Sequence, residues 1–134
     1  MAERYFLRQT EDGDLVIKEE LLTTKAEEWA SKFVGNDPRR PEVKSSQLRK
    51  FYNEVKALAK KAEGEEKFEK IKPLVKMLKV KVNYQKGRQL VPDSFVKFIS
   101  ECVDKVDDKN DFDAFVKHFE AVVGYYYGKA ERFD

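Results

Sequence analysis

Residues 45–88 contain two consecutive amphipathic patterns with the period of an α-helix. In the first pattern apolar residues recur every three or four positions from Leu48 to Leu58, and the second pattern repeats this spacing from Phe68 to Val82. Such spacing places the apolar side chains along one side of each helix. Because both stripes must be buried against other elements, we expect a helical bundle around this stretch.

Three further stretches, at 24–34, 93–106 and 112–127, show the same pattern. A chain of 134 residues is long enough for one domain with a substantial core. Glycine and proline together contribute only ten residues, which disfavours an all-β fold with many turns. We therefore predict an all-α fold, a compact bundle of about five helices.

Several helix ends can be predicted from local chemistry. Thr24 and Glu27 have the spacing of a capping box, so the first helix should begin at residue 23 or 24. Ser45 or Ser46 should cap the second helix. Pro73 interrupts the third helical pattern, which predicts either a kink or a new helix beginning with this proline in its first turn.

The first 22 residues differ from the rest of the chain. Apolar triplets at 5–7 and 15–17 flank an acidic stretch with an Asp-Gly pair at 12–13, which is a hairpin signal. An isolated hairpin is marginally stable in water, so a flexible arm is an equal expectation. We predict an N-terminal arm or hairpin over residues 1–22 and a helical bundle domain over residues 23–134.

The sequence offers little that supports catalysis, so we expect neither an enzyme nor a bound cofactor. His118 is the only histidine, and no serine or cysteine is placed to be activated by it, which favours a structural or surface role. The acidic residues of 104–113 miss the spacing of an EF-hand loop and are better explained as helix capping and solvated loop. We therefore expect no metal site.

The cysteine content and hydropathy indicate a cytoplasmic protein. Cys102 is the only cysteine, which excludes an intramolecular disulfide and a cysteine zinc site. No apolar run approaches the length of a membrane span, so we expect no membrane partner.

Charge is strongly separated along the chain. Residues 43–90 contain fourteen Lys or Arg and five acids, a net charge of +9, whereas the remainder carries −7. This separation is typical of a protein that binds a polyanion through one face. The alternative is a set of solvated lysine faces, as in many highly charged helical proteins.

One lysine stripe of the third helical pattern stands out. Lys72, Lys76, Lys79 and Lys86 follow one another at about one helical turn, and no internal partner is expected for this ladder. Tyr84 lies close to the same stripe and is the best candidate among the tyrosines for contact with a ligand. The predominance of lysine over arginine favours contact with a phosphate backbone over reading of bases.

Two motifs in this segment resemble a known family. Ser46-Gln47-Leu48-Arg49-Lys50-Phe51-Tyr52-Asn53 and Lys79-Val80-Lys81-Val82-Asn83-Tyr84-Gln85-Lys86-Gly87-Arg88 are similar to the small helical subunit of type III-A CRISPR effector complexes, the Csm complexes. The resemblance extends over most of the chain from about residue 21.

The resemblance implies a non-catalytic subunit that stacks head to tail in several copies as a minor filament. Its expected partners are guide RNA, target RNA, the other subunits of the effector complex and further copies of itself. Basic contacts to RNA are implied at Arg49, Lys50, Lys79, Lys81 and Arg88. Helical geometry adds Lys56, Lys60, Lys76 and Lys86, and Tyr84 completes the predicted RNA-binding set. A guide must accept any sequence, so such a subunit should read backbone shape and charge.

A second hypothesis belongs to a different class. The same lysine ridge would suit a helical adaptor that docks an acidic protein partner. Persistence of bound partners after RNase treatment would favour the adaptor, and their loss would favour RNA.

Overall fold

The computed structural model describes residues 4–130, apart from the side chains of residues 65 and 66. Five α-helices follow a short β-hairpin and one turn of 3-10 helix. The elements are β1 (Leu7–Gln9), β2 (Leu15–Ile17), η1 (Glu19–Leu21), α1 (Thr24–Val34), α2 (Ser45–Lys61), α3 (Glu65–Gly87), α4 (Asp93–Lys105) and α5 (Lys109–Lys129). The predicted all-α bundle is confirmed.

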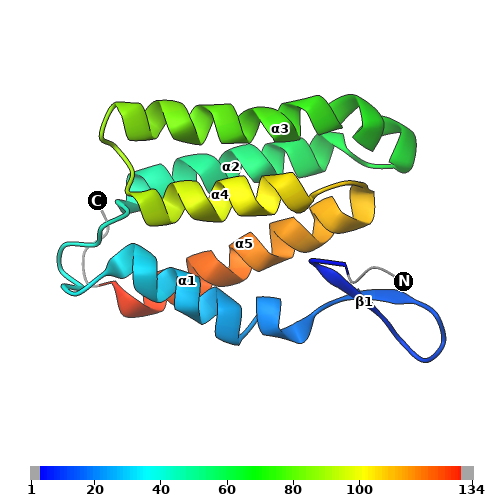
Figure 1. The fold of residues 1–134 in the computed structure, drawn as a ribbon, viewed down its shortest axis with the longest axis horizontal. Coiled ribbons are helices and arrows are strands. Elements are labelled where there is room, and N and C mark those ends of the chain that lie inside the picture. Colours follow the sequence, from blue (N-terminus) through cyan, green and yellow to red (C-terminus); the bar gives the residue numbers. More distant parts are fainter. Residues whose placement is uncertain (1–3, 131–134) are drawn as a thin grey trace.

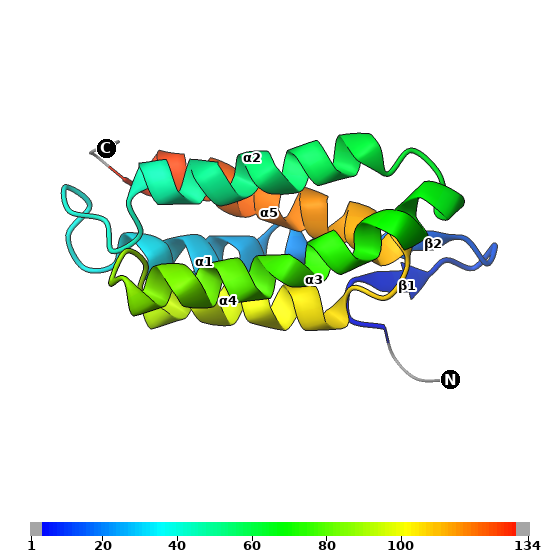
Figure 2. The same ribbon diagram turned by 90° about the horizontal axis from the view of Figure 1, so that it is seen from above.

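The helices pack in neighbouring pairs. α1 lies against α5, α3 lies against α4, and α2 contacts both α3 and α5 (Figure 1). Seen from above, α2 and α3 run side by side and form one face of the molecule (Figure 2). The two basic helical patterns of the sequence therefore share a surface.

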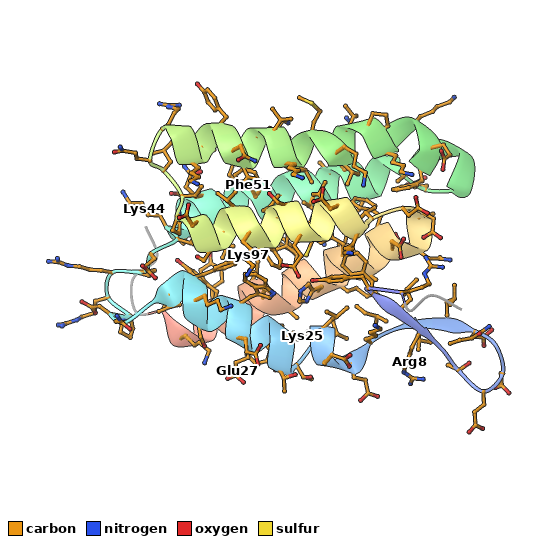
Figure 3. The ribbon with its side chains drawn as sticks, in the orientation of Figure 1. Arg8, Lys25, Glu27, Lys44, Phe51 and Lys97 are labelled. Atoms are coloured by element: carbon orange, nitrogen blue, oxygen red, sulfur yellow. The ribbon has the colours of Figure 1, made fainter. Side chains whose placement is uncertain are left out.

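Aromatic rings hold these layers together. The Phe98 ring on α4 lies between 5.2 and 5.5 Å, centroid to centroid, from the rings of Trp29, Phe33 and Phe119. Phe51 points from α2 toward α4 and meets Phe95 edge to face at 5.2 Å (Figure 3). Aromatic pairs at these distances add to the free energy that comes from burying their area, so α4 is anchored to three other helices at once.

The N-terminal hairpin forms, as one of the two alternatives predicted. β1 and β2 pair antiparallel with Leu7 opposite Ile17. The turn places Gly13 at a φ of 89°, and the Thr10 hydroxyl accepts a hydrogen bond from the Asp14 amide at 3.1 Å. A positive φ favours glycine at this position because glycine has no Cβ.

The hairpin is tied to the bundle at its base. Phe6 is fully buried, and its ring lies 6.3 Å from that of Phe115. Arg4 donates to the carboxylates of Asp108 and Asp111 at 2.9 and 2.8 Å. Burial of Phe6 supplies the apolar contact that an isolated hairpin lacks.

The helices α1 and α2 begin at the predicted residues, but the predicted side-chain caps do not form there. α1 begins where predicted, but Thr24 and Glu27 form no capping box, because Thr23 is the N-cap and its hydroxyl donates to the Glu19 carbonyl. α2 begins at Ser45 as expected, although Lys44 occupies the cap position without a side-chain cap hydrogen bond. A complete capping box forms instead at α5, between Asp108 and Asp111. The interpretation of the acidic stretch as helix capping is therefore confirmed.

α3 is one continuous helix of 23 residues with Pro73 inside it. The prediction of a new helix starting at Pro73 is wrong, because the helix has already completed two turns from Glu65. Proline at this position lacks the amide that would donate to the carbonyl four residues earlier. The missing bond lies on the exposed side of α3, where water can satisfy that carbonyl.

We expect Phe6→Ala to lower the free energy of unfolding by about 3–5 kcal/mol, because it opens a cavity in the shared core. Urea denaturation would measure the change. The matched control is Arg8→Ala, at an exposed position of β1 two residues after Phe6, which should change the free energy of unfolding by less than about 0.5 kcal/mol. Equal stabilities for the two variants would show that the hairpin does not contribute to the core.

Candidate nucleic-acid interface

The outward side of α2 carries five basic side chains and a single carboxylate, that of Glu54, which is paired with Lys81 of α3. Its buried residues, from Leu48 to Leu58, face the core. Helical spacing then directs the remaining positions away from the bundle, and five bases among them are exposed: Arg49, Lys50, Lys56, Lys60 and Lys61. We call these five residues the α2 basic face.

The cations of the α2 basic face are largely uncompensated. Lys50, Lys60 and Lys61 make no hydrogen bond or ion pair with another side chain in the described part of the chain. Lys56 Nζ lies 5.7 Å from the centroid of the Tyr52 ring, and Arg49 Nε makes only a long contact of 3.4 Å to the Ser45 carbonyl. These groups are free to meet an external anion.

The one carboxylate of α2 lies on the same side of the helix as Lys50 and Lys61, and it is paired with a lysine of α3. Glu54 is half-buried and forms an ion pair with Lys81 of α3. The contact joins α2 and α3 near the middle of both helices. Lys81 is therefore the basic residue of α3 that is shown to lie beside α2.

The lysine ladder of α3 has partners on α4 and in the loop that follows it, and the expectation that it lacks internal partners is wrong. Lys72 pairs with Asp107 at 3.2 Å and Lys79 pairs with Asp104 at 2.9 Å. At the far end of α3, Lys86 pairs with the carboxylate of Asp93 at 2.9 Å. The ladder thus faces carboxylates of α4 and of the loop after it, and sequence spacing alone does not show that these groups lie opposite one another.

Lys76 has the most structural role of the predicted residues. Its Nζ donates to the carbonyls of Val103 and Val106, both at 2.7 Å, at the carboxyl end of α4. The last carbonyls of a helix lack partners within it and carry partial negative charge, which favours a cation there. Burial, followed by the charge of Lys72, lowers the pKa of Lys76.

Tyr84 and Arg88 lie at the exposed end of α3. The Tyr84 side chain is 62% exposed, and the Arg88 guanidinium lies 5.8 Å from the centroid of its ring. Both are accessible to a ligand, and Tyr84 continues an apolar row on the outer side of α3.

The structure thus divides the predicted RNA-binding residues into three groups. Arg49, Lys50, Lys56 and Lys60 lie together on α2. Lys81, Tyr84 and Arg88 lie along the outer side and the α2 edge of α3, whereas Lys76, Lys79 and Lys86 are engaged with α4. Lys61 and Lys70 are also exposed, and the sequence-based prediction did not include them. The spacing of Lys61 could have identified it, because it follows Lys50 by eleven residues, close to three helical turns.

The residues that most often carry catalysis are buried and inert. His118 is fully buried, and its Nδ1 donates to the Leu21 carbonyl at 2.5 Å, which confirms a structural role. Burial raises the pKa of the Cys102 thiol and keeps it protonated.

Within residues 4–130 no group of three or more His, Cys, Asp or Glu side chains is arranged to hold a metal ion. None of the described helices is long and apolar enough to cross a bilayer.

Comparison with known proteins gives one match. The family model described as Csm2 Type III-A matches residues 17–131 of the chain. No curated protein and no solved structure matches it. The matched range begins at the last residue of β2 and includes η1 and all five α-helices.

We expect Lys76→Met to lower the free energy of unfolding by about 1–2 kcal/mol, because the carboxyl end of α4 loses two charge-assisted hydrogen bonds. Lys60→Met removes the same charge from an open surface and should change stability by less than about 0.5 kcal/mol. Chemical denaturation of both variants checks the difference. If Lys60→Met were the more destabilising change, Lys76 would not be the structural lysine.

We also expect stability to fall as the pH drops below the ordinary histidine pKa. Burial lowers the pKa of His118 in the folded chain, so the unfolded chain binds more protons and stability rises with pH up to about 6.5. Urea denaturation between about pH 5.5 and 7.5 measures this slope. His118→Asn keeps an amide near the Nδ1 position and should flatten the slope over this window. An unchanged slope in that variant would contradict the assignment to His118.

Proposed function

Since the chain belongs to the Csm2 Type III-A family, the small subunits of type III-A CRISPR effector complexes, we propose that it is a non-catalytic subunit that binds RNA backbone. The RNA is the guide and target of the effector complex, bound without sequence specificity. Several copies assemble side by side with the other subunits of the complex in the cytoplasm.

The α2 basic face is the observation that carries this proposal. Five exposed cations lie on a helix of 17 residues, about 25 Å long, and the one carboxylate among them, Glu54, is already paired with Lys81. Phosphates follow one another along an RNA strand, so cations distributed along a helix can contact several phosphates of the same strand. Release of condensed counterions then supplies affinity that does not depend on base sequence.

The side chains of the α2 basic face favour contact with the RNA backbone over contact with the bases. Four of its five cations are lysines, which act as mobile point charges, whereas the planar fork of arginine suits bidentate contacts. Tyr52 packs its ring against Phe119 at 5.5 Å and is not free to stack on a base. Contacts of this kind position a protein on nucleic acid and carry no sequence information.

The ion-paired lysines of α3 should contribute less to RNA binding. Lys79 and Lys86 would have to exchange an α4 carboxylate for a phosphate, so the net gain in electrostatic free energy is small. Lys76 would give up both of its carbonyl partners. We therefore propose that RNA follows α2 and the seam between α2 and α3.

A non-catalytic role agrees with the chemistry of the described residues. His118 lies in the core, and Cys102 is buried beside Val103. Neither forms a nucleophile and base pair with a group that faces solvent. Cleavage of RNA would then belong to other subunits of the complex.

The test is RNA binding by the full chain at several salt concentrations. For about five phosphate contacts to a single strand, log K against log salt should have a slope near −3.5, at about 0.7 per contact. Lys56→Gln with Lys60→Gln should reduce the slope by about 1.4 and weaken binding on the order of tenfold at low salt.

The matched control is Lys79→Gln with Lys86→Gln, which removes the same charge from the α4 side of α3. It should leave the slope almost unchanged. Affinity that does not vary with salt, or equal losses in the two double variants, would contradict the proposed RNA path.

A further inference from the structure

The outer side of α3 carries a row of exposed apolar side chains. Among the described residues, six large hydrophobic side chains are exposed, and four of them are on this helix. Leu74, Met77, Val80 and Tyr84 are between 45% and 62% exposed and follow one another at steps of three and four residues. We call these four residues the α3 apolar row. A row of this length along one helix marks an interaction surface.

The α3 apolar row has basic edges on both sides. Residues 70–88 contain seven Lys or Arg and no acid. Lys81 and Arg88 flank the row toward α2, and Lys76 and Lys79 flank it toward α4. A partner for this surface should therefore present apolar side chains within an acidic rim.

The hairpin of this same chain has that chemistry. Leu15 is 41% exposed at the start of β2 and lines a hollow with Leu7, Val16, Ile17 and Ala114, and the hollow is bordered on α5 by Asn110, Asp113 and Lys117. Residues 11–20 contain five acids and one lysine, and those of the turn are fully exposed. The hairpin thus offers an apolar centre with an acidic rim, whereas the α3 apolar row has a basic rim.

We propose that the hairpin of one copy docks on the α3 apolar row of the next copy. The inference rests on the proposed function in one respect, namely that several copies assemble. The hairpin and α3 lie on opposite sides of the molecule (Figure 1). A contact between two different surfaces leaves one of each unused, so it repeats and builds a chain of copies.

A two-fold contact between two α3 helices is disfavoured. Such a contact would bring the basic edges of both rows together, including Lys81 and Arg88 of each copy. Like charges placed opposite each other oppose association. The α2 basic face belongs to neither of the two docking surfaces, so a copy that is docked through its α3 apolar row keeps these five cations available to RNA.

The test is the association state of the full chain, measured by sedimentation velocity over a range of concentrations, alone and on a long single-stranded RNA. Met77→Gln with Val80→Gln should raise the concentration needed for association by about tenfold or more. Leu15→Thr alters the hairpin side of the contact and should weaken association to a similar extent. Threonine favours strands, so the hairpin itself should be retained. Leu90→Gln, at an exposed leucine beyond the end of α3, is the matched control and should associate like the unaltered chain.

Mixing the two kinds of variant gives the sharpest result. The intact hairpin of the α3 variant can dock on the intact row of the Leu15→Thr variant, so the mixture should form pairs that do not grow. Growth of the mixture into long chains would show that the hairpin is not the group that docks on α3. The same conclusion would follow if the α3 variant lost association while the Leu15→Thr variant associated normally. A chain that stays monomeric with and without RNA would overturn the contact altogether.

Two readouts separate this inference from the RNA proposal. The docking variants should bind a short RNA that accommodates one copy as tightly as the unaltered chain does. The Lys56 and Lys60 double variant should still self-associate without RNA. If the docking variants self-associate normally but no longer join the other effector subunits, the row serves a different partner and the inference fails.

Discussion

The ammonium group of Lys76 closes the carboxyl end of α4, and this contact determines how α3 lies on the bundle. The last carbonyls of a helix need partners, and here a neighbouring helix supplies them. Lys72 and Lys79 flank the contact with carboxylate pairs, so one side of α3 is committed to α4. The opposite side must then face away from the bundle, and it is there that the α3 apolar row lies.

The same contact divides the basic residues into two populations. In the sequence every lysine of the central segment counts equally toward its excess of positive charge. In the folded chain, Asp93, Asp104 and Asp107 neutralise much of α3, whereas α2 meets no such row. The net charge of a segment therefore overstates the charge available to a ligand, and the available charge is concentrated on α2.

Much of the fold could be predicted because its determinants are local. Apolar spacing identified the helices, and an Asp-Gly turn between apolar triplets identified the hairpin. The partners of individual side chains could not be predicted, because they depend on the register of elements distant in sequence. Lys79 and Asp104 are 25 residues apart, and His118 meets the Leu21 carbonyl across 97 residues. The Thr24 capping box failed for a local reason: the N-cap is Thr23, so Thr24 and Glu27 do not occupy the N-cap and N3 positions that the motif requires.

The proposed RNA site on each copy is a weak one. If α2 binds RNA as proposed, its five exposed cations would give modest affinity at physiological salt, and they would offer no base contact that could fix the position of the protein on the RNA. Linked copies raise the effective concentration of each site for the next stretch of the same strand. If neighbouring copies contact one another through surfaces other than α2, their spacing is set by the protein contact and not by the bases. Each subunit can then remain indifferent to sequence while the assembly as a whole binds tightly.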